Sequence, residues 1–98
     1  MRPALVVSAR DIAGASPLFW AVMITSAKNR GWPDDVSLLE RYAECGLKIP
    51  CVIRCGKIAT FEAATAGRIG RLPRDLLAEV MRVLGTIVNL DESAVDPY

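Results

Sequence analysis

The apolar residues near the C-terminal end follow a helical repeat, and this pattern constrains the fold more than any other feature of the sequence. Charged residues fall off the repeat, which leaves one apolar stripe. Pro73 stands just before the pattern, where its missing N–H costs nothing. The sequence therefore predicts one amphipathic helix, opened by Pro73, that packs its stripe onto the rest of the fold. The stripe consists of Leu76, Leu77, Val80, Val83, Leu84 and Ile87.

Short strand-like runs fill the chain before this helix. The run at 18–24 lacks polar alternation and predicts a strand buried on both faces, whereas 57–62 alternates like a half-exposed strand. Gly56 lies between two such runs and predicts a hairpin turn. Residues 39–46 fit either a helical turn or an irregular loop. The remaining extended segments are expected at 3–8, 35–38, 51–54 and 68–72, with a loop over 10–17.

Length and charge limit what such elements can build. A chain of 98 residues with 52% hydrophobic residues forms one domain with one core. Several strands and one late helix predict an α+β fold or a small β-barrel, in which the helix covers an open side. Twelve Lys and Arg against eleven Asp and Glu give a net charge of +1, so any nucleic-acid site must be a local patch. Residues 89–98 are expected to be a frayed tail.

The apolar runs are far too short to span a membrane, and the first residues lack a hydrophobic signal region, so we expect a cytoplasmic protein. Cys45, Cys51 and Cys55 are odd in number, show no CxxC spacing and have no histidine to complete a ligand set. We predict reduced, mostly buried thiols and no metal site. A redox or nucleophilic role is the alternative, but it needs a base that the chain does not supply.

Six short blocks carry a resemblance to a known family. Residues 2–8, RPALVVS, closely resemble the RPALVLS strand of the MazF/PemK toxins. The other blocks follow in family order, which makes chance an unsatisfactory explanation. They are MITS at 23–26, WPDDVSL at 32–38, GLKIPCVIR at 46–54, KIAT at 57–60 and IGRL at 69–72. The resemblance covers residues 2–87, and on it we expect a toxin domain over 1–88 followed by the tail 89–98.

The resemblance implies a small SH3-like β-barrel of the MazF/PemK and CcdB-like toxin type with a C-terminal amphipathic helix. Such proteins are homodimers that cleave single-stranded RNA without metal or cofactor and are neutralised by a cognate antitoxin. Their chemistry uses the arginine of the RP motif and a Thr or Ser at the end of the following core strand. These match Arg2 and Thr25 here, with Ser26 adjacent.

Each of these residues also has an ordinary structural explanation. As catalytic groups, Arg2 would hold the phosphate and the Thr25 hydroxyl would donate to a phosphoryl oxygen in the transition state. A guanidinium normally stays protonated, so electrostatic stabilisation is a safer role for Arg2 than proton transfer. Without the resemblance, Arg2 reads as a solvated terminal residue, and Thr25 as a strand-end hydroxyl bonded to local backbone.

A basic loop follows Thr25. Lys28, Asn29 and Arg30 with Trp32 fit a platform that neutralises RNA phosphates and stacks one base on the indole. The alternative is a solvated turn with Trp32 folded back as a lid on the core. Further cations that could extend the patch, or simply be surface residues, are Arg54, Lys57, Arg68 and Arg71.

One departure from the family pattern concerns the beginning of the chain. In the family a first strand and a long loop precede the RP motif, whereas here Met1 stands directly before Arg2. We expect an exposed sheet edge, and either a start further upstream or a truncated relative. The alternative function is therefore a catalytically inactive relative that retains antitoxin binding or dimerisation. A toxin directed at DNA gyrase, as in the CcdB branch, is disfavoured because the matching blocks belong to the RNA-cleaving branch.

Overall fold

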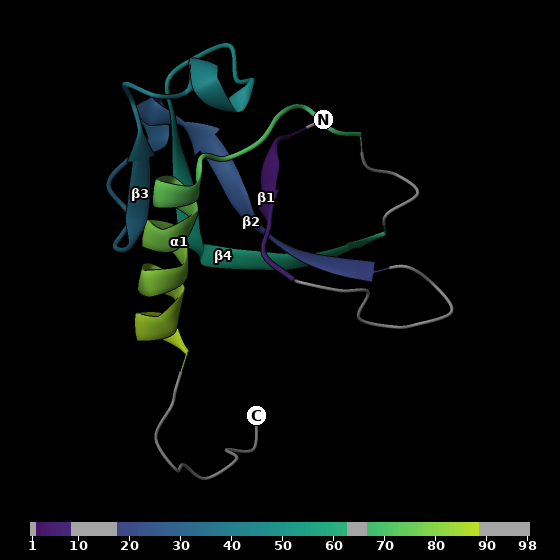
Figure 1. The fold of residues 1–98 in the computed structure, drawn as a ribbon. Helices are drawn as coiled ribbons and strands as arrows, with labels where there is room; N and C mark the ends of the chain where they lie inside the picture. The colour runs from purple at the N-terminus through teal and green to yellow at the C-terminus, as the bar shows by residue number, and fades with distance from the viewer. Residues whose placement is uncertain (1, 9–17, 63–66, 89–98) are drawn as a thin grey trace, which may run out of the picture.

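The computed structural model describes residues 2–8, 18–62 and 67–88 (Figure 1). The predicted loop over 10–17 and the predicted tail over 89–98 lie outside this part of the chain. No helix in the described part is long and apolar enough to cross a membrane. The elements are β1 (Ala4–Val6), β2 (Leu18–Ser26), the 3₁₀ turn η1 (Ala27–Asn29), β3 (Asp35–Leu38), the 3₁₀ turn η2 (Ala43–Cys45), β4 (Cys51–Glu62) and α1 (Arg74–Ile87).

The strands form one antiparallel sheet in the order β1-β2-β4-β3. Figure 1 shows this sheet curled, with α1 against the half that holds β3 and the first part of β4. The predicted helix is confirmed, and its stripe buries Val80, Val83 and Leu84 against Val22 and Ile53 of the sheet. Within the described residues the sheet curls without closing. The predicted barrel-type α+β architecture is therefore present as a half-barrel covered by one helix.

The predicted hairpin at Gly56 is wrong, because β4 continues through it as one strand from Cys51 to Glu62. The register between β2 and β4 shifts at this point: Val22 pairs with Ile58, whereas the next residue, Met23, pairs with Arg54. Residues 55–57 therefore bulge out of the ladder. Gly56 is exposed and its position has open space around it, so it accommodates a bend in the strand rather than a reversal of the chain.

The prediction that residues 18–24 are buried on both faces is also wrong. Ala21 and Val22 are fully buried, but Trp20 is 48% exposed. The first half of β2 pairs with the second half of β4, and Figure 1 shows both extending beyond the helix. At its other end β2 runs past the predicted boundary to Thr25 and Ser26, which pair with Val52 and Cys51. The sheet thus holds the backbone of Thr25.

The segment that leads into α1 crosses η2 at two glycines. Residues 67–73 form no strand, so the extended segment predicted at 68–72 does not join the sheet. Gly46 ends η2 with a φ of 83°, and a Cβ there would lie 2.6 Å from the Ile69 carbonyl oxygen. A Cβ on Gly70 would clash with the backbone carbonyl of Cys45. The predicted choice for 39–46 is resolved as turns that end in this short 3₁₀ turn.

Candidate functional site

The pairing of β1 with β2 brings Arg2 opposite Thr25. Ala4 pairs with Met23, and the Ile24 amide donates to the Pro3 carbonyl oxygen at 3.1 Å. One further step along this antiparallel register places Arg2 across from Thr25. Both residues line an open groove of about 340 Å³. The two residues that the sequence singled out for chemistry therefore share one concave surface.

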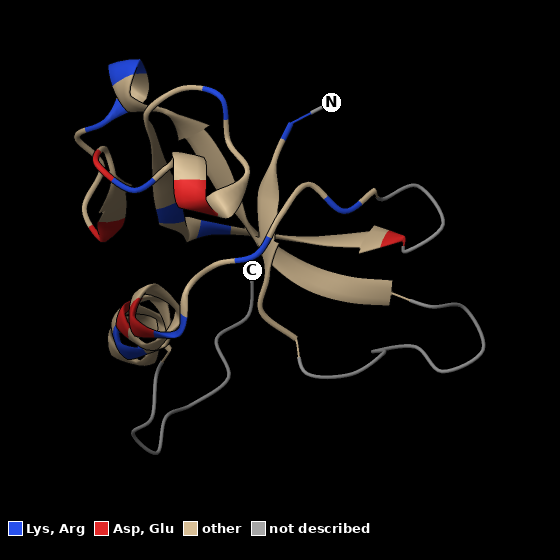
Figure 2. Cartoon of the chain, turned by 45° about the horizontal axis from the view of Figure 1, so that its top comes forward, with Lys and Arg blue, Asp and Glu red and all other residues tan. Residues whose placement is uncertain are grey.

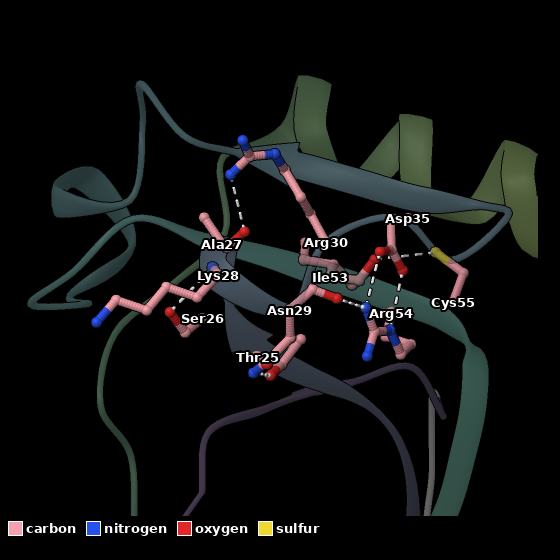
Figure 3. Close-up of polar contacts among 10 residues, drawn as sticks. All are labelled: Thr25, Ser26, Ala27, Lys28, Asn29, Arg30, Asp35, Ile53, Arg54 and Cys55. Carbon is pink, nitrogen blue, oxygen red and sulfur yellow. Dashed lines mark hydrogen bonds and ion pairs between the residues drawn. The ribbon is translucent and has the colours of Figure 1, made fainter.

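The Thr25 hydroxyl is oriented by a neighbouring amide. Asn29 Nδ2 donates to Thr25 Oγ1 at 3.0 Å, as Figure 3 shows. Because this bond uses a lone pair of the hydroxyl, the Thr25 proton remains available for a bond to another acceptor. Asn29 itself lines the groove beside Thr25.

Ser26 lines the groove too, but its side chain also has a local task. Its Oγ accepts from the Lys28 amide at 3.3 Å and so caps the 3₁₀ turn η1. Lys28 is exposed, and in Figure 3 its side chain extends away from Thr25 and Asn29. Arg30 Nη1 donates to the Ala27 carbonyl oxygen at 3.0 Å. Of the residues predicted to bind RNA, Ser26 and Asn29 lie in the groove, whereas Lys28, Arg30 and Trp32 lie outside it.

Lys48 lines the groove from the loop that precedes β4, and the sequence did not single it out. It is exposed, so its ammonium group can approach an anion held between Arg2 and Thr25 without a large desolvation cost. A lysine between Leu47 and Ile49 carries no local signal of such a role. Its place beside β2 follows from the tertiary fold.

Arg54 is buried, which contradicts its predicted place as one of several surface cations. It is 8% exposed, its Nη2 lies 3.0 Å from Asp35 Oδ2, and the same nitrogen donates to the Asn29 carbonyl oxygen at 2.6 Å (Figure 3). Arg54 Nε donates to Asp35 Oδ1 at 3.2 Å, which completes a two-bond fork. Among the described residues, no buried side-chain polar atom lacks a hydrogen-bond partner.

Trp32 covers this ion pair. The Arg54 Cζ atom lies 4.3 Å from the centre of the Trp32 ring, at the distance of a cation–π contact. Trp32 is nevertheless 51% exposed. The indole is therefore a lid over a buried charge pair, and it also retains the exposed surface that a stacking platform requires. Sequence patterns alone left these two descriptions of Trp32 as alternatives.

A second cavity, of about 950 Å³, lies next to the groove and shares Arg2 with it. Its lining is mainly apolar, with residues such as Leu5, Phe19, Met23 and Leu77. The lining also holds three further cations besides Arg2, namely Arg68, Arg71 and Arg74. The smaller groove differs in that it brings the Thr25 hydroxyl and Asn29 together with Arg2, and it is therefore the candidate site for phosphate chemistry.

The three cysteines are free and buried, as predicted. Burial raises the pKa of Cys55 to about 11, and the nearby Asp34, Asp35 and Glu79 carboxylates act in the same direction. Burial also raises the pKa of Cys45 and of Cys51. At neutral pH these thiols stay protonated, which is the opposite of what a nucleophile or a thiolate ligand needs. No three potential metal ligands cluster within the described residues.

Charge over the molecule is mixed. Figure 2 shows Lys and Arg on several parts of the fold, interleaved with Asp and Glu on η2 and α1. This agrees with the net charge of +1. Attraction for an anion must therefore come from local groups of cations, such as Arg2 with Lys48 in the groove or Arg2 with Arg68, Arg71 and Arg74 at the second cavity.

Comparisons with known proteins place this geometry in a family. The model of the PemK-like, MazF-like toxins of type II toxin-antitoxin systems matches residues 1–88. The fold is similar to the Mycobacterium tuberculosis toxin MazF-mt6, with a TM-score of 0.72 and 25% identity over 93% of this chain and 89% of that one. A comparison with curated protein sequences found no match.

A MazE-MazF complex from Deinococcus radiodurans is a second similar structure. The TM-score is 0.68 and the identity 30%, over 88% of this chain and 79% of the matched chain. The family model covers most of the sequence, and the solved structures share its curled sheet and C-terminal helix. The chain belongs to the PemK/MazF family of type II toxin-antitoxin toxins.

Proposed function

We propose that this toxin is an endoribonuclease that cleaves single-stranded RNA without a metal ion, in the groove lined by Arg2, Thr25 and Lys48. The observation that carries the proposal is that Arg2 and Thr25 line the same open groove. The family of the chain makes RNA its expected target. A permanently charged guanidinium and an oriented hydroxyl are the groups that phosphate chemistry can use when no histidine is present.

The reaction is attack of a ribose 2′-oxygen on the adjacent phosphorus. The bond from the 2′-oxygen to phosphorus forms while the bond from phosphorus to the 5′-oxygen breaks. Water in the open groove accepts the proton of the 2′-hydroxyl and supplies the proton that the departing 5′-oxygen gains. The products are a 2′,3′-cyclic phosphate and a 5′-hydroxyl end.

The side chains in the groove act on the negative charge that grows on the phosphoryl oxygens. Arg2 holds two of these oxygens with its planar fork, and Lys48 adds a second positive charge. Thr25 donates its proton to a phosphoryl oxygen, while Asn29 keeps the hydroxyl in the required orientation through its 3.0 Å bond. A donor aimed at the transition state in this way is worth about 10²-fold in rate.

The same family membership supports an antitoxin partner and a homodimer. MazF of Deinococcus radiodurans was solved together with MazE, so we propose a MazE-type antitoxin as the natural inhibitor of this chain. An isologous dimer is the default assembly for a domain of this size. Sedimentation of the purified chain, alone and with the antitoxin, measures both assemblies directly.

Cleavage of a long single-stranded RNA in EDTA tests the enzymatic proposal. The wild type should cut, and labelling with polynucleotide kinase should detect 5′-hydroxyl ends. Thr25→Val removes the hydroxyl while keeping the shape, and should slow cutting about 10²-fold; Arg2→Ala should slow it by at least as much. Lys57→Ala is the matched control, because Lys57 is an exposed cation of β4 outside the groove.

Two results would count against the proposal. Cutting that survives both groove substitutions would place the chemistry elsewhere. A folded wild-type chain that cuts no RNA but still binds the antitoxin would favour an inactive relative.

A further inference from the structure

Arg54 stands between two parts of the surface that the proposed reaction needs. One hydrogen bond leads to Asn29, a residue of the groove, and the guanidinium carbon lies over the ring of Trp32, outside the groove. Arg54 is itself buried, so it cannot reach RNA. Any contribution it makes to the reaction must pass through these two neighbours.

The first path ends at the Thr25 hydroxyl. Arg54 Nη2 holds the Asn29 backbone carbonyl at 2.6 Å, and Asn29 Nδ2 holds Thr25 Oγ1 at 3.0 Å. Asn29 closes the short 3₁₀ turn η1, whose backbone has few internal bonds. An anchor on its carbonyl therefore limits where the amide of the same residue can point.

The second path ends at the Trp32 ring. The guanidinium places its charge over one side of the indole, with Cζ 4.3 Å from the ring centre, and leaves Trp32 about half exposed. Asp35 fixes the guanidinium with a two-bond fork, so the plane cannot rotate freely. A ring that is already oriented loses little conformational freedom when a base stacks on its open side.

We propose that Arg54 is a positioning residue that links the groove to Trp32, keeping Thr25 oriented for the reaction and Trp32 oriented for stacking of a nucleobase. This inference rests on the proposed function in its assignment of RNA as the ligand. The positioning itself can be measured with RNA that cannot be cut.

Arg54→Lys is the decisive variant, because it keeps the charge but loses the planar fork. With both paths disturbed, we expect KM to rise about tenfold, which corresponds to the loss of one stacked base, and kcat to fall about tenfold. Asn29→Ala should lower kcat with little change in KM, and Trp32→Leu should raise KM with little change in kcat. Arg82→Lys, on the exposed pair of α1, is the control and should alter neither constant.

The double variant Arg54→Lys/Trp32→Leu separates positioning from a general loss of structure. If Arg54 acts on binding through Trp32, the double variant has the KM of Trp32→Leu alone. Additive effects on KM in folded proteins would overturn this path. A folded Arg54→Lys protein with the kcat and KM of the wild type would overturn the whole inference.

Nuclear magnetic resonance tests the inference on the wild-type protein, so the result does not depend on whether a variant folds. On addition of single-stranded 2′-O-methyl RNA, the side-chain resonances of Arg54 Nε–H, Asn29 Nδ2–H₂ and Trp32 Nε1–H should shift together, while that of Arg82 stays fixed. Binding and shifts without any cleavage of ordinary RNA would refute the enzymatic proposal and leave the positioning intact. Unchanged resonances at saturating RNA concentrations, or no binding at all, would overturn the inference.

Discussion

Arg54 and Arg41 make similar bonds in opposite surroundings. Arg54 and its partner Asp35 have side chains that are each 9% exposed, and Trp32 covers the pair. Arg41 forms a close ion pair with Asp75 and lies 2.7 Å from Glu44, but these three side chains are between 37% and 68% exposed. The first arginine joins β4 to β3 and η1, whereas the second joins η2 to the first turn of α1.

The difference teaches that burial, rather than the number of bonds, sets the importance of an ion pair. Water solvates the groups around Arg41 whether or not they meet, so their attraction replaces hydration that was already available. The Arg54 guanidinium is largely shielded from water. Loss of its partner Asp35 therefore leaves an unpaired and poorly solvated charge inside the protein. The buried pair should therefore govern stability and the geometry near the groove, and the exposed pairs should govern neither.

Removal of the buried carboxylate should have the largest effect. Asp35→Asn leaves the Arg54 charge without a counter-ion, and we expect a loss of about 3 kcal/mol in the free energy of unfolding. Urea unfolding of Asp35→Asn, compared with Asp75→Asn, measures the contrast. An equal loss of stability in the two variants would contradict the claim that the buried pair contributes more than the exposed pair.

Replacement of both buried charges should have a smaller effect on stability. Arg54→Met with Asp35→Leu leaves no unpaired charge, and similar exchanges in other proteins are often neutral or stabilising. We expect the double variant to regain most of the stability that Asp35→Asn loses, while RNA cleavage stays impaired because nothing holds Asn29 and Trp32. If the double variant regained full RNA cleavage as well as stability, the charge pair would not be needed to position Asn29 and Trp32.

The exposed pairs should show the smallest effect, and it should depend on pH. The Arg41 guanidinium lowers the pKa of Asp75, and Arg82 lowers that of Glu79, in both cases mainly through a hydrogen bond. A lowered pKa in the folded state gives stability that is present above the ordinary carboxyl pKa, near 4, and is lost as the pH falls through the folded value. Asp75→Asn should therefore differ from wild type slightly at pH 7 in low salt and by less near pH 2.

Thermal unfolding at both pH values, with and without added salt, tests this expectation. Salt should erase the difference at pH 7, since exposed charges are screened. A difference that survives high salt would show that the Arg41 pairs behave as the buried pair does.

Local patterns predicted the helix and the approximate positions of most strands, because the periodicity of a helix or strand is present in its own residues. Gly56 shows where this reasoning fails. A glycine between two strand-like runs suits a turn and a bulge equally, and what decides is the partner strand, which here shifts register at Val22 and Met23. The exposure of Trp20 likewise depends on how far α1 extends over the sheet.

Some residues of the candidate site could be predicted from the sequence and others could not. The family motifs identified Arg2 and Thr25, and the fold brings them to one groove. Arg54 and Lys48 escaped correct prediction because their surroundings come from distant parts of the chain. The burial of Arg54 depends on Asp35, its partner in the β3–β4 register, and a cation in a strand-like run reads as a surface residue until that partner is known.

The crossing of Gly46 and Gly70 has a consequence for how proteins of this shape can diversify. At each position an added side chain would meet backbone carbonyl atoms, which cannot turn aside as a flexible side chain could. Nearly every other amino acid is therefore excluded at these two positions, irrespective of what the groove binds. Lys48, in contrast, is exposed in the loop before β4, and an exchange there changes the groove without rebuilding the scaffold. Changes in what the groove binds can thus arise at its rim, while the glycine crossing keeps the segment before α1 against η2.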